Sequence, residues 1–207
     1  MIPRLHPPEA RLLDHVAGGT DPAARALMEC HLALCDACAA RMAGLSQAGG
    51  VLLAQQRPIA APADLFNRIM AQVDQEPQLP GALPFTRALA PYLPADFTRG
   101  WRGALAAGFR FLELGADLPK GVGFYLARMA PGKPFQDHLH QGTEDLVVLA
   151  GGFQDGGERM EAGDWSTMAA ATRHAPRALD GEDCWVVART EADIRFKGWR
   201  GLIQRLA

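Results

Sequence analysis

A run of chelating residues at fixed spacing from two glycines constrains this chain more than any other feature. The run is Gly132-x5-His138-x-His140-x3-Glu144-x6-Gly151. His138 and His140 are one residue apart, so in a β-strand both side chains point to the same side. Glu144 follows after a short loop and can approach the same point. The spacing therefore predicts a strand-rich region that holds two imidazoles and a carboxylate around one metal ion.

The metal cannot be named from these donors. Two imidazoles and a carboxylate bind zinc, iron, manganese or nickel. A fourth donor is offered by His174, which lies eleven residues after Gly163. The competing interpretation makes His138 and His140 exposed turn residues. The chain has only 6 histidines in 207 residues, so this spacing is rare by chance and favours a metal site.

A second group of chelating residues, His31-x3-Cys35-x2-Cys38, lies in the first half of the chain. These positions share one face of a helix, and a helix break at Cys35 would also let them converge. Thiolates and imidazole suit zinc, and a structural zinc site has four ligands. We choose His6 as the fourth, because it precedes the first expected helix and can fold back. The rivals are His15, Glu29 and Cys30. The alternative is that Cys35 and Cys38 are small buried apolar residues.

The two halves of the chain differ in their local patterns. The first 76 residues contain 5 of the 22 glycines, and proline and cap signals predict four helices: Pro8 to about Val16, Ala23–His31, Asp36 to about Leu53, and one that Asp64 caps. The second half predicts short strands, among them 123–130, 145–150 and 184–190. Between them, three prolines and a glycine in 75–84 predict a linker. The expected fold is α+β in two domains: a small helical zinc-binding domain over 1–76, a Pro-rich linker over 77–84 and a β-barrel over 85–207.

Composition and charge exclude several classes. With 21 basic and 23 acidic residues the net charge is -2, and no basic helix is evident, so direct binding to nucleic acid is not expected. No apolar run is long enough to span a membrane. The N-terminus lacks the apolar core of a signal peptide, so we expect a cytoplasmic protein.

The strand-rich half resembles the cupin family. The first cupin motif is complete from Gly132 to Gly151. The second is partial: Gly163 and His174 match, but Ala169 and Ala171 stand where cupins usually have proline and glycine. The resemblance implies a small double-stranded β-barrel that holds the metal inside. The two alanines alter a turn and leave the ligands in place.

The helical half resembles the zinc-binding anti-sigma domain, through His31, Cys35 and Cys38 with His6 upstream. This domain followed by a Pro-rich linker and a cupin is the layout of the ChrR-type anti-sigma factors. That resemblance implies a regulator which binds a sigma factor of the extracytoplasmic-function type and keeps it from RNA polymerase. It also implies that the cupin domain is needed for a response to singlet oxygen or organic peroxides, with an oxidant or small molecule as the signal.

Three questions stay open at this level. The alternative function is a metal-dependent cupin enzyme, either a dioxygenase or a small-molecule hydrolase. The sequence offers no obvious acid–base pair for it, and Glu161 and Tyr125 are left as the open candidates. The apolar stripe of the fourth helix, Leu65 to Val73, either packs on its own domain or docks in a partner's groove. Cys184 lies in an apolar strand, where thiols are usually inert, which disfavours a redox role.

Overall fold

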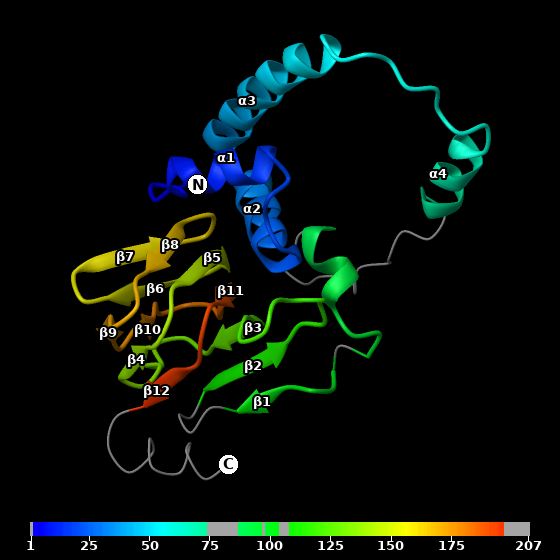
Figure 1. Ribbon diagram of the computed structural model, residues 1–207. Coiled ribbons are helices and arrows are strands. Elements are labelled where there is room, and N and C mark those ends of the chain that lie inside the picture. Colours follow the sequence, from blue (N-terminus) through cyan, green and yellow to red (C-terminus); the bar gives the residue numbers. More distant parts are fainter. Residues whose placement is uncertain (1, 74–86, 97, 104–107, 197–207) are drawn as a thin grey trace.

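The computed structural model describes residues 2–73, 87–96, 98–103 and 108–196. The expected linker over 77–84 lies outside these residues. Helices fill the N-terminal part and strands the remainder, so the predicted α+β class is confirmed (Figure 1). Within the described residues, no helix is both long and apolar enough to cross a membrane.

The helices begin and end close to the predicted signals. They are α1 (Glu9–Val16), α2 (Pro22–Leu34), α3 (Asp36–Ala54) and α4 (Leu65–Val73), followed by the 3-10 helix η1 (Arg87–Tyr92). The Asp21 carboxylate accepts a hydrogen bond from the Ala24 amide at 2.9 Å and so caps α2. The sequence predicted that Pro8 would be the first helical residue of α1, but in the structure Pro8 is the N-cap and the helix begins one residue later.

The strands form three sheets. The strands are β1 (Arg102–Gly103), β2 (Phe109–Glu113), β3 (Gly123–Met129), β4 (His138–His140), β5 (Glu144–Ala150), β6 (Gly152–Asp155), β7 (Glu158–Glu161), β8 (Trp165–Met168), β9 (Arg173–His174), β10 (Arg177–Ala178), β11 (Cys184–Thr190) and β12 (Ile194–Phe196). One sheet has the order β1-β2-β3-β11-β5-β8, and the others have the orders β10-β6-β7 and β12-β4-β9. All pairs are antiparallel, and the expected strand 184–190 is found with the same bounds.

The central strands of the large sheet are buried on both faces, which explains why they are nearly all apolar. On β3, Phe124 and Leu126 pack beneath the helices, whereas Tyr125 and Ala127 face a cavity inside the β-domain. Successive side chains of a strand point to opposite faces, so neighbouring residues of β3 pack against the helices and the cavity in turn. The helices cover only the outer face of this sheet, so its inner face is free to form a site.

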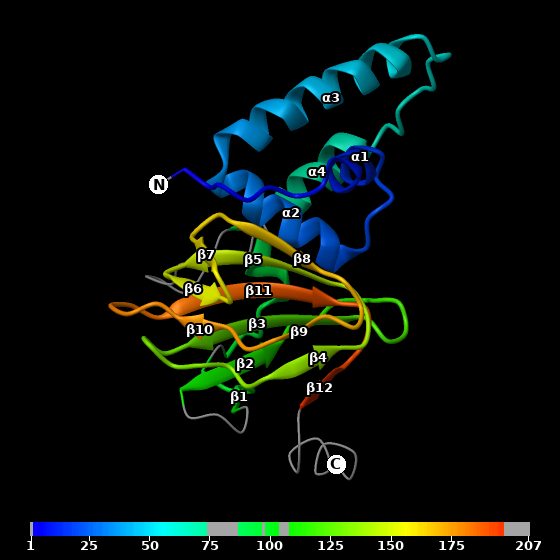
Figure 2. The same cartoon turned by 90° about the vertical axis from the view of Figure 1, so that its left-hand side faces the viewer.

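Helix α2 lies across the outer face of the large sheet, with α1 and α3 beside it (Figure 2). Leu27 and Met28 of α2 belong to the same buried cluster as Val147 and Val187 of the sheet. Arg189 of β11 also donates to Asp21 at the start of α2, with contacts of 2.8 and 2.7 Å. Apolar packing and a nearly buried ion pair therefore join the helical part to the β-domain.

The turn that departs from the cupin pattern has a distinctive backbone. Ala171 has φ +65°, and among the residues that the structure describes it alone lies at positive φ without being a glycine. This is the position where the sequence comparison expected glycine. Its amide donates to the His140 carbonyl oxygen at 2.9 Å, so the turn keeps its conformation against the cost of a Cβ.

Candidate metal centres

The first candidate centre lies at the junction of α2 and α3. His6, His31, Cys35 and Cys38 each place one ligand atom within 4.8 Å of the others. The His6 Nδ1 atom is 3.5 Å from the sulfur of Cys35 and 3.4 Å from that of Cys38. These are the four residues chosen from the sequence, and His15, Glu29 and Cys30 are not in the group.

A break between two helices builds this geometry. His31 lies in the last turn of α2, and Cys38 lies in the first turn of α3. Cys35 sits between them as the N-cap of α3 with extended backbone angles, φ -129° and ψ 96°. Of the two arrangements that the sequence allowed, the structure therefore has the helix break.

The donor atoms fit a metal ion. His31 is fully buried, and its Nδ1 atom donates to the Gly163 carbonyl oxygen at 2.7 Å. Its other nitrogen, Nε2, is buried without a hydrogen-bond partner among the described residues. Burial lowers the pKa of His31, which leaves a neutral ring with a free lone pair. Burial, and then the neighbouring Cys35, raise the pKa of Cys38 to about 11. A bound cation would reverse that effect by stabilising the thiolates.

A turn of the β-domain holds this centre from outside. The buried Asp164 carboxylate accepts the amides of Arg4 at 2.7 Å and Leu5 at 3.0 Å. The Trp165 amide then donates to the Leu5 carbonyl oxygen at 3.0 Å. Residues 4 and 5 are thereby fixed immediately before His6, while the adjacent Gly163 carbonyl orients His31. The β7–β8 turn thus positions both imidazoles of a centre whose four donors all come from the N-terminal part.

The second candidate centre lies inside the β-domain and joins β4 to β9. The backbone register places His138 opposite His174, and β4 directs His138 and His140 to one side. The Nε2 atom of His174 is 2.8 Å from that of His140 and 2.9 Å from that of His138. Three imidazole nitrogens this close together can coordinate one metal ion, which would sit between them.

Two of these imidazoles are oriented by a partner on the far ring nitrogen. The Nδ1 atom of His138 donates to the Gln136 carbonyl oxygen at 2.7 Å, and that of His174 contacts the Asp155 carboxylate at 2.5 Å. Such partners direct the Nε2 lone pair inward. Burial lowers the pKa of His138 and of His140 to about 4, so both rings are neutral at neutral pH.

Glu144 lies beside the three histidines but outside the group whose ligand atoms converge. Its carboxylate is 4.0 Å from Nδ1 of His140, the nitrogen that faces away from His138 and His174. Burial, followed by the nearby Asp145, raises the pKa of Glu144 to about 8. The structure therefore brings His138, His140 and His174 together and places Glu144 next to them, in contact with His140.

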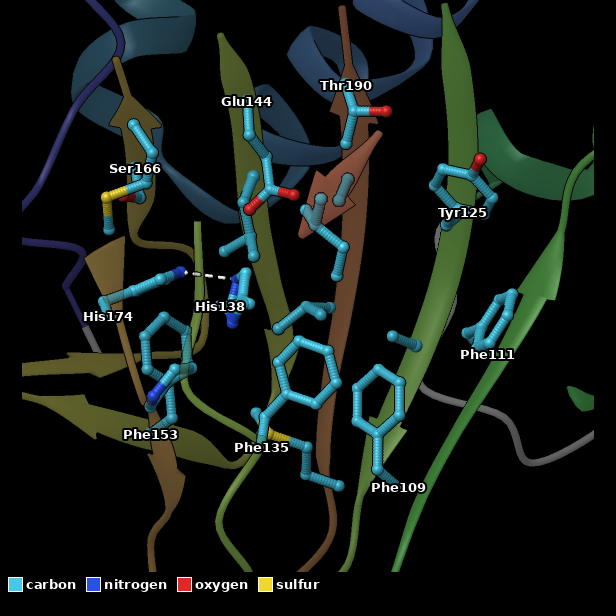
Figure 3. Close-up of a pocket in the computed structure, with 18 of the residues that line it drawn as sticks. Phe109, Phe111, Tyr125, Phe135, His138, Glu144, Phe153, Ser166, His174 and Thr190 are labelled. Carbon is cyan, nitrogen blue, oxygen red and sulfur yellow. Dashed lines mark hydrogen bonds between the residues drawn. The ribbon is translucent and has the colours of Figure 1, made fainter. Parts of the chain in front are cut away.

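A cavity of about 590 Å³ opens beside the second centre. Figure 3 shows His138 and His174 on one side of it, Glu144 and Thr190 at one end, and Phe109, Phe135 and Phe153 at the other. Tyr125 also lines the cavity. Glu161 pairs with Arg159 on β7 and is not among the lining residues.

Sequence reasoning missed the residues that support the ligands. In the sequence Asp155 only precedes two glycines, which is typical of a turn, and Gly163 is only a position of the second cupin motif. Asp164 carried no recognisable signal, because its role depends on a contact with residue 4 that spans 160 positions. Buried carboxylates that accept backbone amides can be found only once the fold is known.

Comparisons with known proteins agree with this architecture. Residues 98–192 match the profile of the ChrR cupin-like domain family. Over 96% of its length the chain is 33% identical to the anti-sigma-E factor ChrR of Cereibacter sphaeroides, of which it covers 95%. A chain in the crystal structure of Rhodobacter sphaeroides SigE in complex with the anti-sigma ChrR superimposes with a TM-score of 0.72 and 32% identity. That match covers 91% of this chain and 99% of the other.

The fold and the two centres define a cupin-like β-domain preceded by a helical unit with a His/Cys cluster. Similarity along the whole chain identifies the particular family: the protein belongs to the ChrR family of anti-sigma factors. The predicted resemblance is therefore confirmed. The relative matched over 96% of the chain is an anti-sigma factor and not an enzyme, which supports the non-enzyme interpretation over a cupin dioxygenase or hydrolase.

Proposed function

We propose that the chain is an anti-sigma factor that binds a sigma factor of the extracytoplasmic-function type and keeps it from RNA polymerase core enzyme. The observation that carries the proposal is whole-chain similarity to an anti-sigma-E factor, together with structural similarity to a chain in a SigE complex. No direct contact with nucleic acid is part of this function. Because such a sigma factor works in the cytoplasm, the proposal includes that location.

The sigma-binding surface is proposed to lie on the far end of α3 and on α4. Figure 1 shows the end of α3 and all of α4 arching away from the β-domain. No residue of α4 is buried, and Phe66 is 71% exposed. Leu53 near the end of α3 is 73% exposed. Exposed apolar side chains at helical spacing suit a groove on a partner protein. This favours docking over packing of α4 on its own domain.

The first centre, His6, His31, Cys35 and Cys38, is proposed to hold zinc. Its two sulfurs and two imidazoles are the donors of a closed structural site. The ion would fix the angle between α2 and α3, and α3 leads to the exposed apolar surface. Residues 1–76 would form the sigma-binding domain, 77–84 the linker and 85–207 the sensor domain.

The second centre is proposed to hold zinc, iron, manganese or nickel on His138, His140 and His174, with Glu144 as the fourth ligand. A bound metal would supply a Lewis-acidic position that faces the cavity. The sensor domain would respond to an oxidant, singlet oxygen or an organic peroxide. The response can lower sigma affinity only if the signal favours the released form over the bound form.

Complex formation between the metal-loaded full chain and its sigma factor tests the proposal. A change of Ile69→Asp places a charge within the apolar stripe of α4, and Ala71→Asp places the same charge on the opposite, exposed face of that helix. We expect a 1:1 complex that Ile69→Asp weakens at least tenfold and Ala71→Asp leaves nearly unchanged. Equal affinities for the two variants would reject α4 as the docking surface, and no complex for the unchanged chain would reject the function.

A further inference from the structure

We propose that the cavity of the β-domain binds a neutral amphiphile, a molecule with a hydrocarbon body and one hydroxyl or hydroperoxide group at one end. The hydrocarbon would lie among the phenylalanines, and the oxygen would lie beside Glu144 and Thr190. Binding itself does not depend on the anti-sigma function. Only the consequence, that the bound molecule changes sigma affinity, rests on the proposed function.

The walls of the cavity form a continuous aromatic surface. Phe135 stacks on Phe109 with ring centroids 4.2 Å apart, and the tilted ring of His138 has its centroid 4.7 Å from that of Phe135. Phe111 and Tyr125 extend this arc with an edge contact at 5.9 Å. Aliphatic and sulfur side chains complete the walls, among them Met129, Leu146, Met168 and Val186. Such a surface attracts hydrocarbon and offers little to a polar molecule.

Oxygen atoms gather at one end of this space. Thr190 of β11 is the register partner of Glu144 of β5, so the two side chains lie next to each other on the inner face. Ser166 of β8 lines the same cavity. Figure 3 shows these three groups, with Tyr125, at the end away from Phe109, Phe135 and Phe153. One end can therefore exchange hydrogen bonds with a ligand while the other end is apolar.

The charges around the cavity favour a neutral head over a carboxylate. Glu144 and Asp193 line it and are acidic. Arg102 is the basic residue among the lining groups, but its side chain is 70% exposed and lies 4.0 Å from Glu113. A hydroxyl can exchange hydrogen bonds with Thr190 and Ser166, whereas a carboxylate would lose its hydration there, with no buried lysine or arginine among the described lining residues to pair with it.

The volume sets the size of the ligand. About 590 Å³ lies within the range of small-molecule pockets. At roughly 30 Å³ for a small group such as water, this space holds about 20 non-hydrogen atoms. A chain of about ten to fifteen carbons with a terminal oxygen would therefore fit in the cavity.

A series of straight-chain alkanols tests the proposal by calorimetry on the metal-loaded full chain. Affinity should rise about fourfold with each added methylene, since every buried methylene gains hydrophobic transfer free energy. The rise should stop at a definite chain length, when the cavity is full. Absence of saturable binding, or a rise without a limit, would overturn the proposal.

Three variants locate the binding. Ala188→Phe fills the cavity from β11 without changing a candidate ligand and should weaken decanol binding more than tenfold. The same change at exposed Ala95 should leave binding unaltered. Thr190→Val removes the hydroxyl at nearly constant shape and should lower the affinity for decanol about threefold to tenfold. The gain in affinity per added methylene should stay unchanged. If Ala188→Phe lost its metal or its fold, Thr190→Val and the length limit would still decide.

A second titration separates this proposal from the proposed function. Affinity of the chain for its sigma factor is measured with and without saturating decanol. Decanol binding with an unchanged sigma complex would support the cavity ligand and reject its signalling role. A sigma complex without any alkanol binding would support the anti-sigma function and overturn the cavity ligand.

Discussion

The Asp164→Asn variant tests whether the β-domain holds the first metal centre in shape. The Asp164 carboxylate accepts three backbone amides, from Arg4 and Leu5 on one oxygen and from Glu161 at 2.8 Å on the other. An asparagine side chain keeps the size but offers only one acceptor oxygen, so one amide must face an NH₂ group. Asp164 is 1% exposed, and water cannot easily replace the lost contact.

The loss can be estimated from these contacts. Removing one charge-assisted hydrogen bond and leaving a buried donor unpaired costs about 2 kcal/mol. If the amide of residue 4 or 5 loses its hydrogen bond, the backbone before His6 is no longer fixed and His6 is held less firmly in the centre. Because 1.4 kcal/mol corresponds to a tenfold change, the first centre should bind metal roughly 30-fold more weakly.

Cobalt titration with zinc competition measures this directly, because cobalt bound to two sulfurs and two nitrogens has characteristic visible absorption. Asp117→Asn, at an exposed position of the β-domain, is the matched control and should bind like the unchanged chain. An unchanged cobalt affinity in Asp164→Asn, with reduced thermal stability, would show that Asp164 supports the fold but not the metal centre.

Four further predictions follow from particular contacts. Ala171→Gly should raise the free energy of unfolding by about 0.5–1 kcal/mol, because Ala171 lies at φ +65°; calorimetric unfolding measures this. Cys184 should resist thiol reagents in the folded chain, since it is fully buried and burial raises its pKa to about 12; mass spectrometry of labelled peptides decides. Burial would raise the pKa of Asp21, but hydrogen bonds from Arg189 and from the Ala24 amide outweigh it and lower the pKa below 3.8. The ionised Asp21 therefore stabilises the folded chain fully above about pH 4, and this contribution is lost as the pH falls through the pKa of Asp21 in the folded state. In Asp21→Asn the free energy of unfolding should accordingly depend less on pH below 4. His140→Ala should reduce bound metal from two ions to one per chain by elemental analysis, and loss of both ions would contradict separate centres.

The sequence predicted those parts of the site that depend on local spacing. His138 and His140 are brought together by strand alternation alone, and His31, Cys35 and Cys38 by one helix break. His174 was predicted only from its spacing to Gly163, and its approach to the other two histidines depends on the pairing of β4 with β9, which has no local signal in the sequence. Local periodicity and motif spacing therefore identified most donors before the fold was known.

The packing of the helices on the β-domain could not be predicted in the same way. A change of pattern near residue 76 suggested two separate units, yet α2 shares a buried cluster with Phe124 and Val187. The contacts of Asp164 with residue 4, and of His31 with Gly163, join positions more than 130 residues apart. Such contacts arise from the shape of the whole molecule and have no periodic signal.

The most direct test of the account is competition for the sigma factor. The purified, metal-loaded chain is mixed with its extracytoplasmic-function sigma factor and with RNA polymerase core enzyme, and transcription from a promoter that needs this sigma factor is measured. The account predicts a stable complex of chain and sigma factor, and transcription that falls to background at equimolar chain. Full transcription at a large excess of the chain, with no complex on gel filtration, would contradict it.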